Sequence, residues 1–489
     1  MVFSSNVFLL YFMPVFFLVY FLMPQRSRNY VLLFASVLFY AYGAPEFVIQ
    51  LVLSTIANFF IVKWMCKAEK PIGKKLLCAL SILISLGLLF YYKYGNFTME
   101  NINALLHLSG KPALTWEKIL LPIGISFFSF QSVTYTLDVY RGISKPMEKL
   151  SDFMLYIAMF PQLIAGPIIR YCDVAEQIRE RQSTMDDRLQ GFYRFVIGLC
   201  KKILIADVIG AEVDAVLGPS NYTLLSVEQL ADIAADIAAL DTGTAWIIAI
   251  AYAFQIYFDF AGYSDMAIGL GRIMGFRFPE NFDNPYNSAS ITEFWRRWHI
   301  TLGSFIKNYL YIPLGGNRVK HKSRMYFNLW LCFLISGLWH GASWNFIVWG
   351  ALHGLFICAD KLFLTKLMQK LGRIPSVILT FLTVCVIWVF FRVERLDFAL
   401  MFIQRMFAFD FAPIRFSANI HLYVTMIVAA FFSFFTLSKY GLKMQENVYF
   451  SAFSDKKHIV AWCLAAFAFV FCVAAMNASG FSPFIYFRF

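Results

Sequence analysis

The chain has 489 residues, of which 60% are hydrophobic and only 15% charged, and it includes 55 Phe, 25 Tyr and 11 Trp. A soluble globular domain of this length does not need so much apolar side chain. The formal net charge of +12 would suit nucleic-acid binding. However, the basic residues cluster in short connections between apolar runs, which indicates a membrane protein and no nucleic-acid partner.

Apolar windows close to the length of a membrane span recur along the chain, since one helical crossing needs about 20 apolar residues. They lie at residues 6–23, 46–62, 76–91, 246–260, 375–391, 422–437 and 459–475. The first window lacks a basic start and further spans follow it, so we expect a membrane helix there and not a cleaved signal peptide. The sequence therefore predicts an all-α, polytopic membrane protein with about 11–12 membrane segments, some of them re-entrant.

Basic residues in the connections set the expected orientation of these spans. They are found within residues 26–28, 63–75, 361–373 and 439–457. Because cytoplasmic loops are enriched in Lys and Arg, these connections should face the cytoplasm. Both chain ends should then lie outside, as should the polar part of residues 203–271, which contain no Lys or Arg before Arg272. The stretch 170–202 mixes Arg and Glu at helical spacing, which predicts an amphipathic helix on the cytoplasmic surface.

Nine cysteines are scattered singly, and no Cys-x-x-Cys pair occurs. This spacing indicates neither a metal site nor a disulfide framework. The simplest interpretation is that the cysteines are small apolar side chains in the membrane.

The middle of the chain does not follow the pattern of ordinary spans. Residues 275–324 are rich in aromatic and Asn residues, and a 35-residue apolar stretch, 325–359, follows between basic flanks. Two full crossings need about 40 residues plus a turn, so we expect a hairpin that bends inside the bilayer at residues 339–343. Irregular backbone at that depth is tolerated only against protein or a water-filled cavity, so the bend should line a central chamber.

His340 lies at the predicted bend, within the sequence Ser336–Trp344. A titratable ring at membrane depth costs free energy unless it is paired or functional. Imidazole also suits proton transfer near neutral pH. A core histidine bonded to a backbone carbonyl is the alternative, and the residue alone does not decide between the two.

Several longer motifs carry a family resemblance. They are Phe258–Asp265, Trp295–His299, Tyr311–Gly316 and Leu338–Trp344, together with Pro161–Pro167 and Trp388–Arg392. In this order they resemble the membrane-bound O-acyltransferase (MBOAT) family, most closely its bacterial branch that acetylates alginate and peptidoglycan. The resemblance implies one MBOAT membrane domain over residues 1–489, a catalytic core region at 275–359, and a place in the bacterial inner (cytoplasmic) membrane.

The resemblance also implies a catalytic pair. In the family, the histidine in the position of His340 is the proposed base, and His299 matches the second characteristic polar position. His340 would take a proton from an attacking hydroxyl, while His299 would orient the donor or stabilise developing charge. His353, beyond the bend, is expected to be a packed histidine at a helix interface.

The donor implied by the resemblance is a cytoplasmic acetyl thioester, either acetyl-CoA or an acyl carrier, with no tightly bound cofactor. Its phosphates would suit cationic side chains. The candidates are Arg296, Arg297, Lys307 and Arg318. An ordinary basic rim on the cytoplasmic side is the simpler interpretation of any one of them.

The C-terminal tail, Phe481–Phe489, is strongly aromatic and would be costly to leave in water. An interfacial aromatic anchor is the plain interpretation. Phe484–Phe489 also resembles the C-terminal motif of bacterial acylation systems, in which a tyrosine hydroxyl carries the acyl group. This resemblance implies that His340 deprotonates Tyr486, and that acetyl-Tyr486 passes the group to an extracytoplasmic SGNH-type acetyltransferase that modifies a glycan.

Other functions are compatible with parts of this pattern. A D-alanyl transferase, or a lipid- or protein-modifying acyltransferase of the same superfamily, would share His340 without needing Tyr486 on this chain. A secondary transporter also places polar groups at mid-bilayer, but it would be expected to show inverted repeats, and the sequence shows none. The expected partners are the lipid bilayer, the SGNH-type enzyme and an extracytoplasmic polysaccharide.

Overall fold

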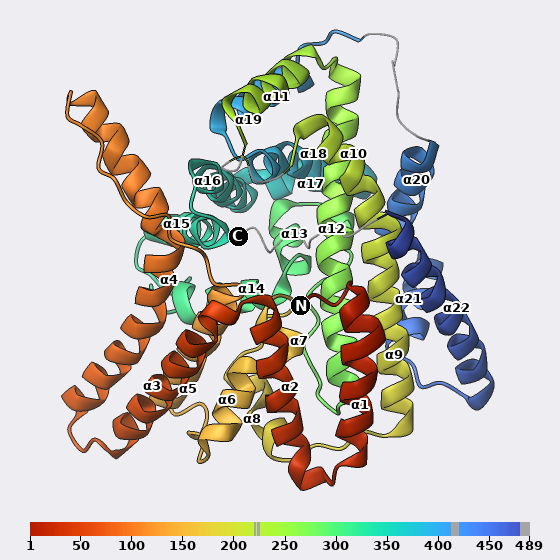
Figure 1. The fold of residues 1–489 in the computed structure, drawn as a ribbon. Coiled ribbons are helices and arrows are strands. Elements are labelled where there is room, and N and C mark those ends of the chain that lie inside the picture. Colours follow the sequence, from red (N-terminus) through yellow and green to blue (C-terminus); the bar gives the residue numbers. More distant parts are fainter. Residues whose placement is uncertain (220–221, 223–224, 412–419, 480–489) are drawn as a thin grey trace. The chain divides into compact units, whose positions relative to one another are not determined.

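The computed structural model describes residues 1–219, 222, 225–411 and 420–479. Within these ranges the chain forms helices and loops with no strand, so the all-α prediction is confirmed (Figure 1). Seven helical segments of the described part are long and apolar enough to cross a membrane, and Val7–Leu22 is a shorter apolar helix. A polytopic helical membrane protein is therefore confirmed, while the larger total of about 11–12 membrane segments stays a prediction.

The chain divides into two compact units, neither of which is continuous in sequence. Unit 1 comprises Met1–Phe192 and Met266–Pro279, and unit 2 comprises Tyr193–Asp265 and Glu280–Phe489. Two helices, α9 (Met185–Cys200) and α12 (Thr242–Ile273), pass from one unit into the other.

Unit 1 is built from the N-terminal helices. They are α1 (Met13–Leu22), α2 (Arg28–Gly43), α3 (Val48–Lys67), α4 (Pro71–Leu108), α5 (Ile125–Tyr140), α6 (Leu150–Ala158), α7 (Phe160–Leu163) and α8 (Tyr171–Arg179), with the short turns η1 (Val7–Phe12), η2 (Gln25–Ser27) and η3 (Pro45–Phe47). Asn58 of α3 accepts a hydrogen bond from Ser81 of α4 at 2.6 Å, and Ser81 meets Thr136 of α5 at 2.7 Å. Such polar contacts join helices where lipid offers no hydrophobic driving force.

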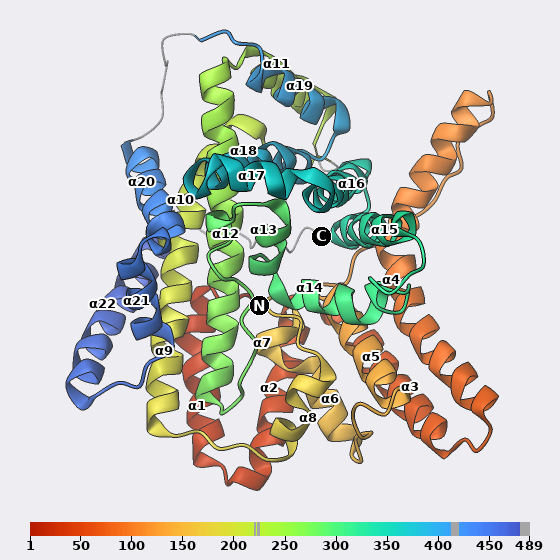
Figure 2. The ribbon, with the colours of Figure 1, turned by 180° about the vertical axis from the view of Figure 1, so that it is seen from behind.

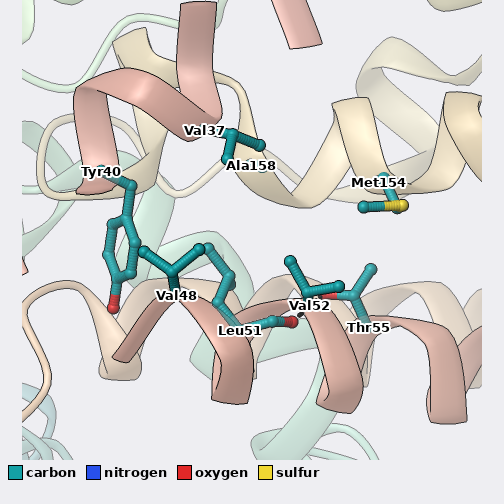
Figure 3. A pocket seen from close by; sticks show the side chains of 8 residues that line it. All are labelled: Val37, Tyr40, Val48, Leu51, Val52, Thr55, Met154 and Ala158. Carbon is teal, nitrogen blue, oxygen red and sulfur yellow. Dashed lines mark hydrogen bonds between the residues drawn. The ribbon is translucent and has the colours of Figure 1, made fainter. Parts of the chain in front are cut away.

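A small apolar pocket lies between α2, α3 and α6 of unit 1 (Figure 3). Its lining is aliphatic apart from Tyr40 and Thr55, and the Thr55 hydroxyl donates to the Leu51 carbonyl oxygen at 2.7 Å. The pocket contains none of the residues that the sequence singles out for chemistry.

Unit 2 holds the remaining helices. They are α10 (Asp207–Leu217), α11 (Val227–Ala239), α13 (Ile291–Arg297), α14 (Ile300–Ile306), α15 (Lys322–His340), α16 (Trp344–Ala359), α17 (Thr365–Leu371), α18 (Arg373–Arg392), α19 (Leu396–Met406), α20 (Ile420–Phe434), α21 (Lys439–Tyr449) and α22 (Asp455–Ser479). Short π or 3-10 turns join them: η4 (Lys201–Ala206), η6 (Pro285–Asn287), η7 (Lys307–Tyr311), η8 (Asp360–Leu364) and η9 (Phe435–Leu437).

The prediction of one surface helix over residues 170–202 is wrong for the second half of this stretch. Helix α8 ends at Arg179, and α9 continues through η4 into α10 without a break. Within unit 2, Arg194 and Lys201 pair with Asp265 of α12 at 2.7 and 2.6 Å, so their charges are neutralised inside the protein. The partner carboxylate lies more than 60 residues away in sequence, and a local charge pattern cannot reveal it.

Helices α15 and α16 form the predicted hairpin, with the bend at residues 341–343 (Figure 2). Their backbones touch, since a Cβ added at Gly350 would lie 3.0 Å from the Cα of Gly337 and would overlap the carbonyl oxygen of Phe333. The second arm is longer than the sequence predicts, because the helical segment Trp344–Leu371 has 28 residues and continues past Lys361. That arm is long enough to cross a membrane by itself, so the depth of the bend stays a prediction.

The close contact of α15 with α16 makes a testable prediction. Gly350→Ala should lower the stability of the purified protein by about 1–3 kcal/mol, because the added methyl group forces the two backbones apart. Thermal unfolding in detergent measures the change. Gly87→Ala on α4, where an added Cβ meets nothing within 4 Å, is the matched control and should be neutral or slightly stabilising. Equal effects of the two substitutions would contradict the close packing.

Candidate functional site

His340 is the last residue of α15 and lies in an aromatic cage within unit 2. Its ring centroid is 4.8 Å from that of Trp339, 4.9 Å from Trp349 and 5.3 Å from Phe391. The residue is 1% exposed. The His340 ring is therefore surrounded by the C-terminal end of α15 and by these three aromatic rings. Bulk water is excluded from it.

The structure brings His299 next to His340, with ring centroids 6.5 Å apart. His299 immediately precedes α14 and has a left-handed backbone conformation, with φ 44° and ψ 54°. A non-glycine residue in that region costs of order 1–3 kcal/mol and persists only where its surroundings hold it. Such strain is typical of functional sites, and here it places the ring against Phe260, at a centroid distance of 4.7 Å.

The side chain of Asn281 fixes the orientation of His299. Its Oδ1 lies 2.9 Å from His299 Nδ1 and accepts a hydrogen bond of 2.8 Å from the Thr301 hydroxyl. Asn281 Nδ2 donates to Ser264 Oγ at 3.1 Å, and the backbone N–H of Thr301 donates to Oδ1 at 3.4 Å. Because an N–H group can only donate, the Thr301 contact distinguishes the two ends of the amide. Because Oδ1 can only accept, His299 Nδ1 carries the hydrogen and Nε2 holds the lone pair.

Burial lowers the pKa of His299 to about 3. The ring is fully buried, and removal from water disfavours the charged imidazolium. His299 is therefore neutral near pH 7, in one defined tautomer. A neutral ring of this kind accepts a hydrogen bond or a proton at Nε2 and donates none there.

His353 also packs against Trp349, whose ring centroid is 4.9 Å from that of His340 and 4.8 Å from that of His353. Trp295 Nε1 donates a hydrogen bond of 3.1 Å to His353 Nδ1. This is the packing expected of a histidine at a helix interface.

The four cations proposed for phosphate binding differ in their surroundings. Arg297 of α13 pairs with Glu293 at 3.0 Å and with Asp283 at 3.4 Å, so its charge is already engaged within the protein. The other three are exposed: Arg296 on α13, Lys307 at the start of η7, and Arg318 in the loop that follows. Their role in binding a donor stays a prediction. Tyr486 and the tail 481–489 lie outside the described residues.

Sequence reasoning missed Asn281 and Ser264 as parts of this site. Asn281 lies in the stretch 275–324, which is rich in aromatic and Asn residues, and Ser264 lies in the motif Phe258–Asp265, but neither residue was given a role. Their position 17 residues apart in sequence hides the hydrogen bond between them. The signal available was the density of Asn in an otherwise apolar chain, since buried amides normally serve a hydrogen-bonding purpose.

Comparison with known proteins agrees with this arrangement. The sequence model of the membrane-bound O-acyltransferase family matches residues 82–395, which include both His299 and His340. The chain is 39% identical to the probable alginate O-acetylase AlgI of Pseudomonas putida over the full length of both proteins. It is 32% identical to the peptidoglycan O-acetyltransferase of Helicobacter pylori, over 100% of this chain and 98% of the relative. A teichoic acid D-alanyltransferase of Streptococcus thermophilus is 28% identical over 51% of this chain and 59% of its own length.

The family match covers well over half of the chain, and the two O-acetylation relatives cover all of it. Together with the helical membrane architecture and the two adjacent buried histidines, this establishes that the chain belongs to the membrane-bound O-acyltransferase family and is an acyltransferase.

Proposed function

We propose that the chain transfers an acetyl group from a cytoplasmic thioester to Tyr486 and onward to an extracytoplasmic polysaccharide. The observation that carries the proposal is the pair of buried imidazoles, His299 and His340, with ring centroids 6.5 Å apart. The relatives named for alginate and peptidoglycan O-acetylation support acetyl as the transferred group and a polysaccharide as the final acceptor. The relative named for D-alanylation matches only half of this chain, which makes D-alanine transfer the weaker candidate.

The chemical step is an acyl exchange between sulfur and oxygen. His340 takes the phenolic proton of Tyr486 as that oxygen attacks the carbonyl carbon of the donor thioester. The carbon–sulfur bond breaks, the leaving thiolate takes up the proton from His340, and an acetyl ester of Tyr486 remains. An aromatic cage that excludes water protects this ester from hydrolysis inside the protein.

His299 has a narrower role than the family resemblance implied. A neutral ring with its lone pair at Nε2 cannot donate a hydrogen bond to a developing oxyanion from that nitrogen. It can accept one from an N–H or O–H group, such as an amide of a pantetheine arm or the hydroxyl of Tyr486. We therefore assign His299 to orienting the donor or the acceptor, and not to stabilising negative charge.

The direction of transfer follows from the expected orientation of the chain in the membrane. The basic connections place the donor side in the cytoplasm, where Arg296, Lys307 and Arg318 would meet the phosphates of the donor. Helix α22 starts next to Lys456 and Lys457, so its far end, and the tail after it, would emerge outside. There an SGNH-type acetyltransferase would take the acetyl group from Tyr486 and pass it to the polysaccharide.

The acyl-tyrosine intermediate gives the first prediction from this mechanism. Mass spectrometry of the C-terminal peptide from cells should find an acetyl adduct on Tyr486 in the wild type and none in His340→Ala, because the phenol then lacks its base. His107→Ala, at an exposed histidine of α4, is the matched control and should keep the adduct. Equal acetylation of Tyr486 in the wild type and in His340→Ala would contradict the role of His340.

The hydrogen bond from His299 to Asn281 gives a second prediction. Asn281→Leu should lower the rate of acetyl transfer by roughly 10- to 100-fold, because the ring loses its orientation and its tautomer. Asn281→Asp keeps the acceptor but adds a charge that favours imidazolium, so its activity should be retained best at high pH and fall more steeply than the wild type on acidification. Both rates are measured by transfer of labelled acetyl groups in membranes. Identical pH profiles for Asn281→Asp and the wild type would count against this role.

The depressed pKa of His299 predicts how stability depends on pH. The folded protein binds this proton only near pH 3, whereas the unfolded chain binds it below about 6.5, so stability should fall as pH drops from 6.5 towards 3. His299→Gln should weaken this dependence by up to about 1 kcal/mol per pH unit, and His107→Gln should leave it unchanged. Apparent melting temperatures across this pH range test the point, and an unaltered slope in His299→Gln would show that the buried ring is not the cause.

A further inference from the structure

Cys200 and Cys472 come from distant parts of the sequence and meet inside unit 2. Their sulfur atoms are 3.6 Å apart, and both thiols are free. Cys200 is the last residue of α9, and Cys472 lies in the second half of α22. A disulfide needs sulfurs about 2.05 Å apart, so the two atoms have to approach by about 1.5 Å. A change in side-chain torsion can supply that shift without a change of fold.

Helix α22 is held by a narrow strip of contacts. Only 11% of its most apolar window is buried, against 78% for α12. Its buried side chains Ala465, Cys472 and Met476 follow helical spacing and so lie on one face. Near its start, the Tyr193 hydroxyl donates a hydrogen bond of 3.1 Å to the carbonyl oxygen of His458. Figures 1 and 2 show α22 at the outer edge of unit 2, where few other elements cover it.

The two cysteines differ in how a reagent can reach them. Cys200 is partly exposed, and Cys472 is fully buried behind it. We therefore expect a small oxidant to meet Cys200 before Cys472, and the neighbouring thiol of Cys472 to react with the oxidised sulfur. Cys472 also lies 15 residues beyond Lys457, about 22 Å along the helix and towards its expected outer end. Because a membrane crossing is about 30 Å long, this places the pair in the expected outer half of the membrane.

We infer that Cys200 and Cys472 form an oxidation site at which a peroxide converts two thiols into a disulfide that fixes α22 to the end of α9. The Cys200 thiolate attacks the peroxide, forms a sulfenic acid and releases hydroxide. The Cys472 thiol then attacks the sulfenic sulfur, the sulfur–sulfur bond forms and water leaves. The two thiols together lose two electrons and two protons, and one hydrogen peroxide is reduced to two waters.

The consequence for activity rests on the proposed function. Helix α22 leads directly into residues 480–489, which carry Tyr486. A covalent link at Cys472 leaves only the last turns of α22 free to adjust when Tyr486 moves between its donor and its external acceptor. The disulfide therefore slows acetyl transfer, and reduction restores it.

The oxidation site is tested on the full-length protein in native membranes, independently of activity. After treatment with hydrogen peroxide and alkylation of the remaining thiols, peptide mass spectrometry should find the Cys200 and Cys472 peptides joined, with the loss of two hydrogens. The linked species should be absent in Cys472→Ser and present in Cys463→Ser, a control at an exposed cysteine of the same helix. Complete alkylation of Cys200 and Cys472 under conditions that oxidise the exposed Cys66 would overturn the assignment.

The effect on transfer is measured on the same samples. Oxidised wild-type protein should lose acetyl transfer several-fold and recover it with a dithiol reductant, whereas Cys472→Ser should be insensitive to peroxide. A linked but fully active protein would overturn the regulatory role and leave the oxidation site in place. Absence of acetyl-Tyr486 in both reduced and oxidised protein would contradict the proposed function alone, because the disulfide is detected without it.

Discussion

An imidazole that is removed from water needs its hydrogen bonds supplied by the protein, and this constraint shapes the site of unit 2. Asn281 accepts from His299 Nδ1, Thr301 donates to the same amide oxygen, and Ser264 accepts from the amide nitrogen. Asn281 lies in the loop before α13, Thr301 lies on α14, and Ser264 lies on α12. Each has to be in place before the neutral ring of His299 is defined, so the folding of these elements and the chemistry of the ring are a single problem.

The position of the second histidine, His340, depends on helix packing. His340 ends α15, and its position follows from the backbone contact of Gly337 with Gly350 of α16. Glycines at a helix interface let the two helix axes approach closely. The close approach of α15 and α16 brings the rings of Trp339 and Trp349 into contact with the His340 imidazole. The two imidazole rings are 6.5 Å apart. This distance therefore depends both on the hydrogen-bonded loop that holds His299 and on the tightly packed hairpin that holds His340.

The sequence predicted the features that are local. Apolar windows located the spanning helices, and the Gly-Ala-Ser interruption after His340 located the bend between α15 and α16. Prediction from the sequence failed for residues whose interaction partners lie far away in the chain. Arg194 and Lys201 were assigned to a surface helix because nothing near them announces Asp265, and Asn281 received no role because its partners lie 17 and 20 residues away. The contact of Cys200 with Cys472 spans 272 positions and has no local signature at all. For the catalytic pair, the resemblance of motifs singled out His299 and His340, and only the structure could supply their distance and the tautomer of His299.

In the proposed mechanism, the acetyl group is transferred in the space between His299 and His340. The most direct measurement is an electron cryomicroscopy structure of the protein with a non-hydrolysable analogue of acetyl-CoA, a thioether in which a methylene group separates the sulfur from the carbonyl carbon. The account predicts that the carbonyl carbon of the analogue lies between the two imidazoles, with a hydrogen-bond donor of the analogue or of Tyr486 facing His299 Nε2. An acyl group bound elsewhere, with Trp339, Trp349 and Phe391 still closed around His340, would contradict it.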